Sequence, residues 1–192
     1  MSCQRFTKMA FFVATFRFVL NPSPKFICCF HSSNSRSYSQ FHDETEHNLV
    51  SLFNSLLHQN PTPPIFKFGK ILGSLVKENH YSTAISLHRQ MEFKGIASNL
   101  VTSNILINCF SQLGQNSFSL PVFANILKKG YEPDTITLTA LIKGLCLKGV
   151  IHQALHFHDK VAALGFQLNQ VSYSTLINGL CKVGETKLPC SC

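Results

Sequence analysis

The heptapeptide VTSNILI at residues 101–107 decides the fold, because the chain repeats it as ITLTALI at 136–142 and as VSYSTLI at 171–177. Each copy begins 35 residues after the one before it. Self-similarity at a constant period of about 20–50 residues is typical of solenoids, in which small units of one kind stack in a row. The repeat therefore takes priority over any single residue in the interpretation of this sequence.

Each 35-residue unit is predicted to contain two helices. If the units begin at positions 65, 100, 135 and 170, apolar side chains in each half recur at helical spacing. In the first half of the third unit these are Ile136, Leu138, Leu141, Ile142 and Leu145. In its second half they are Ala154, Leu155, Phe157 and Val161, with His158 on the same side. Each unit is therefore expected to form a helical hairpin.

The turns of the units carry residues that tolerate a left-handed backbone, which commonly ends helices. The residues in question are Asn79, Gly114, Gly149 and Gly184 between the two helices, and Gly95, Gly130 and Gly165 after the second helix. Helices this short are marginal alone in water, so the hairpins must stack to bury their apolar stripes. The sequence predicts an all-α fold, an α-solenoid of helix-turn-helix hairpins.

This pattern resembles the pentatricopeptide repeat (PPR) family of organelle RNA-binding proteins. The resemblance rests on the period of 35, on the Val-Thr-x-Asn-x-Leu-Ile opening at 101–107 and on the Gly-Leu-Cys-Lys-x-Gly turn at 179–184, and it covers roughly residues 44–187. It is strongest to the plant P-type subgroup, which includes fertility-restorer-like proteins, and it implies a right-handed superhelix. The tetratricopeptide repeat is the nearest rival, but its period is 34 residues and its Trp and Leu-Gly-x-x-Tyr pattern are missing here.

The repeat frame divides the chain into six segments. They are a disordered transit peptide at 1–42, an N-terminal capping helix with a Pro-rich turn at 43–64, full repeats at 65–99, 100–134 and 135–169, and a partial repeat at 170–192. The capping helix is expected over 43–59, with Leu49, Leu52, Phe53, Leu56 and Leu57 on its apolar side. The tail of the last segment lacks the apolar positions that a second helix needs. The array is therefore expected to be truncated within its fourth repeat.

Residues 1–42 have the composition of a targeting segment. They contain no Asp or Glu, many Phe and Ser residues, and the basic residues Arg5, Lys8, Arg17, Lys25 and Arg36. This composition is typical of an organellar transit peptide. The arginines and the aromatic run favour the mitochondrion, with the chloroplast as the alternative. A secretory signal is disfavoured because Arg17 interrupts the apolar stretch, and no run of about 20 apolar residues predicts a membrane span.

The net charge of the repeat region is small. The whole chain has a formal charge of +8, but residues 43–192 carry 12 Lys and Arg against 9 Asp and Glu. Such mild basicity is compatible with a nucleic-acid partner but does not require one.

The sequence predicts no enzyme, metal, cofactor or small-molecule substrate. It has no Gly-x-Ser-x-Gly motif and no phosphate-binding glycine loop. His152 and His156 are four residues apart on one helix but have no third ligand at a defined spacing. Cys146 and Cys181 occupy the same position in two units, and we expect both to be small buried helix residues.

Two residues depart from the repeat pattern. Pro121 lies in the second helix of the second unit, where it is expected to fall near the first turn and to cost little. Ser98 stands where Pro133 stands in the next unit. We expect that replacement to loosen the turn.

The PPR resemblance implies a binding surface for single-stranded RNA, with one base for each repeat. The second residue of each unit would be an apolar wedge on which bases stack. The fifth and the last residue of a unit would contact the base edge, and we call these two a base-recognition pair. The wedges are Phe66, Val101, Ile136 and Val171; the pairs are Gly69 with Asn99, Asn104 with Asp134, and Thr139 with Asn169, while Ser174 has no partner.

The family's code associates Asn with Asp to uracil and Thr with Asn to adenine. Gly69 offers no side-chain hydrogen bond, so the first unit should be nearly indifferent, and Ser174 should favour a purine. A simpler interpretation is that the fifth residues lie near helix starts and the last residues follow glycine turns, so that both kinds serve as caps. Lys77, Lys148 and Lys182 are candidates for phosphate contacts or for ordinary solvated surface.

The expected function is organellar RNA binding in transcript processing, stability, splicing or translation, together with other RNA-processing proteins. The alternatives are a protein-binding scaffold of helical repeats and a truncated, weakly functional product of a longer repeat protein.

Overall fold

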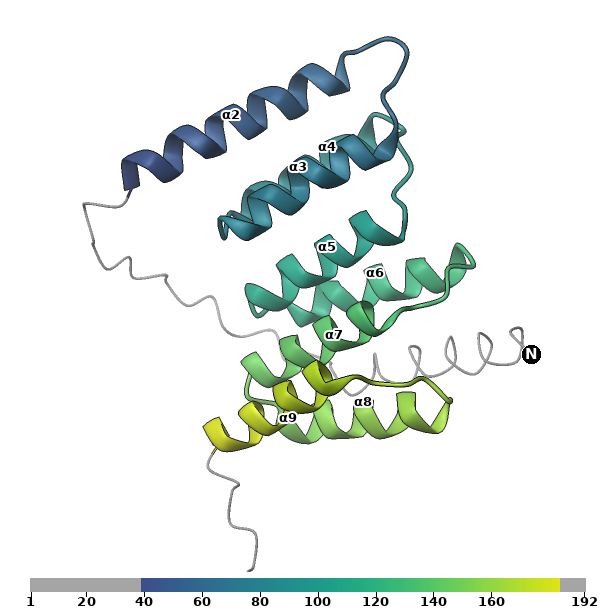
Figure 1. The fold of residues 1–192 in the computed structure, drawn as a ribbon. Coiled ribbons are helices and arrows are strands. Elements are labelled where there is room, and N and C mark those ends of the chain that lie inside the picture. The colour runs from purple at the N-terminus through teal and green to yellow at the C-terminus, as the bar shows by residue number, and fades with distance from the viewer. Residues whose placement is uncertain (1–38, 184–192) are drawn as a thin grey trace, which may run out of the picture.

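The computed structural model describes residues 39–183, and this part of the chain is entirely α-helical (Figure 1). The eight helices are α2 (Ser39–Leu57), α3 (Ile65–Lys77), α4 (Tyr81–Phe93), α5 (Leu100–Gln112), α6 (Asn116–Lys128), α7 (Thr135–Leu147), α8 (Ile151–Ala163) and α9 (Gln170–Val183). The predicted α-solenoid is confirmed. Most of the predicted transit peptide and the end of the fourth unit lie outside the described residues.

The helix starts follow the 35-residue period without drift. The first helices of the units begin at 65, 100, 135 and 170, and the second helices begin at 81, 116 and 151. The turns contain the left-handed residues that the sequence predicts: Asn79, Gly95, Gly114, Gly130, Gly149 and Gly165 all have positive φ. The residue after each of them donates a backbone hydrogen bond to the carbonyl five residues earlier, for example from the Gln115 amide to the Phe110 carbonyl at 2.8 Å. This is the hydrogen bond of a Schellman motif. The predicted turn at Gly184 lies outside the described residues.

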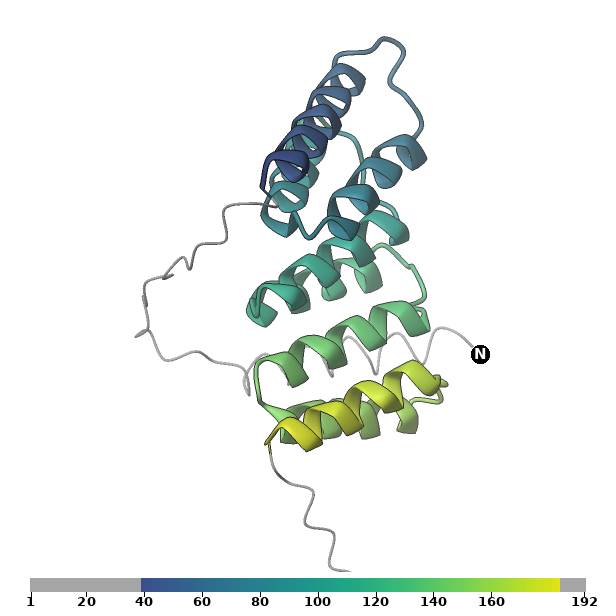
Figure 2. The same ribbon diagram turned by 60° about the vertical axis from the view of Figure 1, so that its left-hand side comes forward.

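The helices form two layers (Figures 1 and 2). The first helices α3, α5, α7 and α9 pack against one another in series, whereas within 39–183 the backbones of the second helices contact first helices and not each other. In a curved stack of repeats, neighbouring elements lie closer on the inner side than on the outer side. The first helices therefore form the inner layer of the array.

Helix α2 covers the start of the array. The ring of Phe53 is fully buried, and its centroid lies 5.2 Å from that of Phe68 in an edge-on arrangement. Burial of a side chain of this size contributes about 1.5–3 kcal/mol. The helix begins at Ser39, four residues before the predicted start. Leu52, expected on the apolar side, is 51% exposed.

Two predictions about the core are wrong. Ile136 is 67% exposed, although the other four residues of its predicted stripe are buried, because the second position of a unit faces out from the first helical turn. Cys181 is exposed and Cys146 is half-buried. The sulfur of Cys146 faces Gly179 of the following first helix, where an added Cβ would lie 2.8 Å from it. No described helix follows α9, so the same position is open at Cys181.

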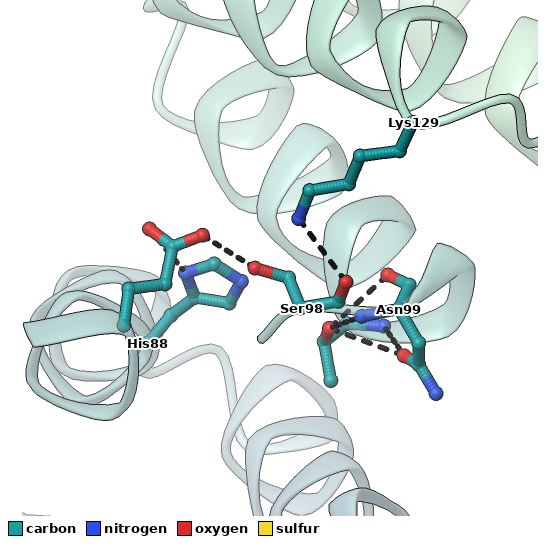
Figure 3. A network of polar contacts seen from close by, with 6 residues as sticks. His88, Ser98, Asn99 and Lys129 are labelled. Atoms are coloured by element: carbon teal, nitrogen blue, oxygen red, sulfur yellow. Dashed lines mark hydrogen bonds and ion pairs between the residues drawn. The ribbon is translucent and has the colours of Figure 1, made fainter. Parts of the chain in front are cut away.

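Pro121 and Ser98 also differ from expectation. Pro121 is the sixth residue of α6 and so lies in the second turn, where it removes the amide that would bond to the carbonyl of Ser117. Both residues are exposed, so water can solvate that carbonyl. Ser98 is buried, its hydroxyl donates to the Glu92 carboxylate, and its carbonyl accepts from Lys129 Nζ at 3.2 Å (Figure 3). That turn is held rather than loosened.

None of the described helices is both long enough and apolar enough to cross a membrane.

Candidate nucleic-acid interface

The second residue of every unit is an exposed apolar side chain on the inner layer. Phe66, Val101, Ile136 and Val171 are between 54% and 67% exposed, and each lies in the first turn of a first helix. Large apolar groups exposed at one frame along an array are typical of a binding surface. Lys70 Nζ lies 5.6 Å from the centre of the Phe66 ring, so a positive charge accompanies the first wedge. The structure thus aligns all four predicted wedges.

The pair formed by Asn104 and Asp134 is brought into direct contact. Asn104 Nδ2 donates to Asp134 Oδ1 at 3.2 Å, although the two residues are 30 apart in sequence. The same carboxylate oxygen accepts from the Thr137 amide at 2.8 Å. Thr137 Oγ1 lies 2.6 Å from Asn104 Oδ1 and 2.7 Å from Asp134 Oδ1. The pair is therefore part of a three-residue network that joins the second unit to the third.

Thr139 and Asn169 are joined through a third residue. Thr139 Oγ1 lies 2.6 Å from Ser172 Oγ, which in turn lies 3.1 Å from Asn169 Oδ1. Thr139 also donates to the Thr135 carbonyl at 2.6 Å. Ser172 takes the place of Thr137, but here it bridges the two members of the pair, which Asn104 and Asp134 join by a direct hydrogen bond.

The first unit has the same frame without the fifth side chain. Asn99 Oδ1 accepts from the Thr102 amide at 2.9 Å, and the Asn99 amide donates to Thr102 Oγ1 at 3.1 Å (Figure 3). A Cβ added to Gly69 would lie 3.7 Å from the methyl group of Thr102. Gly69 therefore lies where Asn104 and Thr139 lie in the next units, but it offers nothing to a base.

Sequence reasoning missed the third residue of each unit. Thr102, Thr137 and Ser172 have no exposed surface, and each contacts the last residue of the preceding unit. The signal was present in the repeated heptapeptides, whose second letter is always Thr or Ser. What the sequence did not show is that the hydroxyls of Thr137 and Ser172 face a partner more than 30 residues earlier in the chain.

The capping interpretation holds for the last residues and fails for the fifth residues. Asn99 and Asp134 are the N-caps of α5 and α7, and Asn169 accepts from the Ser172 amide at 3.1 Å in the same way. A cap of this kind contributes about 1 kcal/mol. The fifth residues lie inside their helices: the hydroxyls of Thr139 and Ser174 bond to carbonyls four residues back, at 2.6 and 2.8 Å. Capping therefore does not account for them.

The three candidate lysines lie at the far ends of the first helices. Lys77 and Lys182 are in last turns, and Lys148 follows α7 directly. The fifth residue is eight or nine positions earlier, which is about 12 Å along a helix. All three lysines are exposed, but the structure does not bring them together with the base-recognition pairs.

The described part of the chain has no candidate metal centre, since it contains no group of three or more His, Cys, Asp or Glu residues that could hold an ion.

Burial raises the pKa of the Cys109 thiol to about 12. Burial likewise raises the pKa of Cys146 above its usual value. Thiols that remain protonated at neutral pH are poor nucleophiles and poor metal ligands.

The stacked hairpins, with an apolar wedge and a polar pair at one frame, place the chain in the class of α-solenoid repeat proteins. Residues 101–147 and 133–182 match the PPR repeat family. These matched residues consist of PPR repeats, so the resemblance to the PPR family that the sequence predicted is confirmed for this part of the chain.

Three relatives from Arabidopsis thaliana are pentatricopeptide repeat-containing proteins that are named as mitochondrial. A putative one is 32% identical over 118 residues, which are 62% of this chain and 20% of the relative. A second is 36% identical over 84 residues, or 44% of this chain and 13% of the relative. A third is 33% identical over 118 residues, or 56% of this chain and 23% of the relative. The names of these relatives agree with the predicted localisation, and the chain spans less than a quarter of each of them.

Two crystal structures show the same fold. The PPR protein PPR10 in complex with an 18-nt psaJ RNA element covers 73% of this chain with a TM-score of 0.60 and 22% identity, and 21% of that protein is matched. PPR10 from maize covers 75% of this chain with a TM-score of 0.54 and 16% identity, and 22% of that protein is matched.

Proposed function

We propose that this chain binds single-stranded RNA in the mitochondrion, with one base on each repeat. The observation that carries the proposal is the recurrence, on the inner layer, of an exposed apolar wedge beside a polar pair whose identity changes from unit to unit. Apolar surface stacks with any base, whereas a polar pair can select one. The crystal structure of PPR10 in complex with an RNA element supports a nucleic-acid partner for this fold.

The pairs assign a base to each of two units. Asn104 with Asp134 would take uracil, and Thr139 with Asn169 would take adenine. Gly69 with Asn99 would accept any base, and Ser174 would favour a purine. Asn104 is only 8% exposed, so a base would meet the edge of its amide group and the more accessible carboxylate of Asp134.

Loss of the wedges tests the proposal. In the full chain, Val101→Ser with Ile136→Ser should weaken binding to a labelled single-stranded RNA by about tenfold or more, because two apolar contact surfaces are lost and even one aromatic stacking surface contributes roughly 1–3 kcal/mol. The measurement is fluorescence anisotropy at low salt. Phe93→Ser is the matched control, because Phe93 is 92% exposed but lies on the second helix of the first unit. Equal affinity of the double variant and the wild type would contradict an RNA surface on the inner layer.

The cellular step would be transcript processing, stabilisation, splicing or translation, with other RNA-processing proteins as partners. Crosslinking in isolated mitochondria, followed by sequencing of the bound RNA, would identify the transcript. Protein partners captured equally well before and after RNase treatment, with no crosslinked RNA, would indicate a protein scaffold instead.

A further inference from the structure

We infer that the third residue of each unit is a positioning residue, which fixes the hydrogen-bonding groups that the preceding base-recognition pair presents to a base. The inference rests on the proposed RNA-binding function and deepens it. It concerns Thr137 for the second unit and Ser172 for the third unit. Neither residue has exposed surface, so each would act through the pair and not by touching RNA.

Hydrogen-bond counting fixes the orientation of Asn104. The Asp134 carboxylate can only accept, so the amide nitrogen of Asn104 must face it, at 3.2 Å. This orientation turns Asn104 Oδ1 towards Thr137 Oγ1, 2.6 Å away. Asp134 Oδ1 lies 2.7 Å from the same hydroxyl but already accepts from the Thr137 amide and from Asn104. Asn104 Oδ1 has no other donor in the described chain, so we assign the single hydroxyl hydrogen to it. Without this hydroxyl, nothing would hold the oxygen of Asn104 inward.

The fixed orientation leaves a defined pattern of groups for a base. Within the described chain, one N–H of Asn104 and the second carboxylate oxygen of Asp134 have no partner. The pair therefore presents one donor and one acceptor. Uracil has a carbonyl oxygen next to its N3–H, which complements that pattern.

Ser172 fixes the next pair with the roles exchanged, so that the last residue presents the donor and the fifth residue the acceptor. The Thr135 carbonyl can only accept, so the hydroxyl hydrogen of Thr139 goes to it, and Thr139 Oγ1 must then accept from Ser172 Oγ at 2.6 Å. The Ser172 amide holds Asn169 Oδ1 inward at 3.1 Å. Asn169 then presents its N–H groups, and Thr139 presents the remaining lone pair of its oxygen. The N1 acceptor and N6 amino donor of adenine complement this pattern.

Thr102 provides a control within the same chain. It makes the same cap with Asn99, at 2.9 Å from the Thr102 amide to Asn99 Oδ1. Its fifth-residue neighbour is Gly69, which has no side chain to orient. Removal of the hydroxyl loses a contact with the N-cap residue at both positions, with Asn99 at Thr102 and with Asp134 at Thr137, but it should change base preference only at Thr137.

The test compares Thr137→Val with Thr102→Val in the full chain. Valine keeps the shape of threonine and removes the hydroxyl. The probes are short oligo(C) RNAs that carry one U beside one A, in both orders, and matched RNAs in which that U is replaced by C. For the wild type, the U-containing RNA should bind about tenfold tighter, as expected for one good pair of contacts to a base.

Thr137→Val should bring this U-to-C ratio close to one, while binding to the C-containing RNA stays nearly unchanged. Thr102→Val should keep the wild-type ratio, and Thr137→Ser, which retains a hydroxyl, should keep it as well. Melting temperatures of all variants would show that they are folded. An unchanged ratio in Thr137→Val, or an equal loss in Thr102→Val, would overturn the inference and leave the proposed function standing. A wild-type chain that binds none of the RNAs would overturn the proposed function itself.

Discussion

Two interfaces in the array have the same backbone arrangement but different side chains: the interface between the first and second units, and that between the second and third units. At the first, Gly69 leaves the recognition position empty, and a Cβ added to Gly73 would contact nothing within 4 Å. At the second, Asn104, Thr137 and Asp134 form a continuous network. There a Cβ added to Gly144 would lie 2.7 Å from Ser111 Oγ and would also collide with Asn116 Oδ1.

The difference separates what builds the solenoid from what makes each unit specific. Left-handed turn residues and buried apolar residues recur along the described array, and side-chain caps recur at the starts of α5, α7 and α9. These shared features build the stack. The side chains at the fifth position change without moving the helices, whose starts keep the 35-residue period. A repeat protein can therefore alter its binding surface one unit at a time.

The largest expected effect is steric and lies in the tight interface. Gly144→Ala should destabilise the protein by about 2 kcal/mol, because overpacking of a buried site costs roughly 1–3 kcal/mol. Gly73→Ala, at a helix glycine one position earlier in the frame of its unit, is the control. It should be neutral or stabilising by up to about 1 kcal/mol, since alanine favours helix and its methyl group meets open space. Denaturant unfolding followed by circular dichroism measures both. Equal effects of the two substitutions would mean that the interfaces are packed alike.

The next effect compares the two helix caps. Asp134→Ala should cost about 2 kcal/mol, because it removes the cap of α7 and also leaves the buried amide of Asn104 without its acceptor. Asn99→Ala should cost about 1 kcal/mol, since Gly69 provides no side chain that loses a partner. The two variants are compared by thermal unfolding. A cost at Asn99 that equals or exceeds the cost at Asp134 would show that the network adds nothing to the cap.

The smallest expected effect is a pH dependence of stability that arises in the first unit, from His88 in α4. His88 is 2% exposed and lies beside Ser98 (Figure 3). Burial lowers its pKa, while Glu92 acts in the opposite direction and Lys129 in the same direction as burial. The unfolded chain therefore binds a proton on His88 more readily than the folded chain. Its contribution to stability is complete above the ordinary pKa of 6.5 and declines as the pH falls below that value.

As the pH falls below 6.5, the melting temperature should therefore decrease more steeply in the wild type than in His88→Phe. Parallel curves for the two proteins would remove His88 from the explanation.

Periodicity predicted what depends on a residue and its neighbours in sequence. The helix starts at 65, 100, 135 and 170 and the left-handed turns follow from one repeated frame, and the PPR resemblance applied to that frame gives the wedges from Phe66 to Val171. What could not be predicted depends on contacts between units. Thr137 faces Asn104 from 33 residues away, Cys181 is exposed because no described helix covers it, and Ser98 is held by Lys129 at the end of the next second helix. A single repeat contains no information about such partners.

Exchange of one pair for the other tests most directly the claim that each unit selects its own base. Thr139→Asn with Asn169→Asp recreates in the third unit the pair formed by Asn104 and Asp134. The variant should move the preference of that unit alone from adenine to uracil, by about 1–3 kcal/mol in relative affinity. The salt dependence of binding should stay nearly constant, because no phosphate contact changes. The measurement is competition between RNAs that differ at a single base, and equal binding of all four bases before and after the exchange would contradict the account.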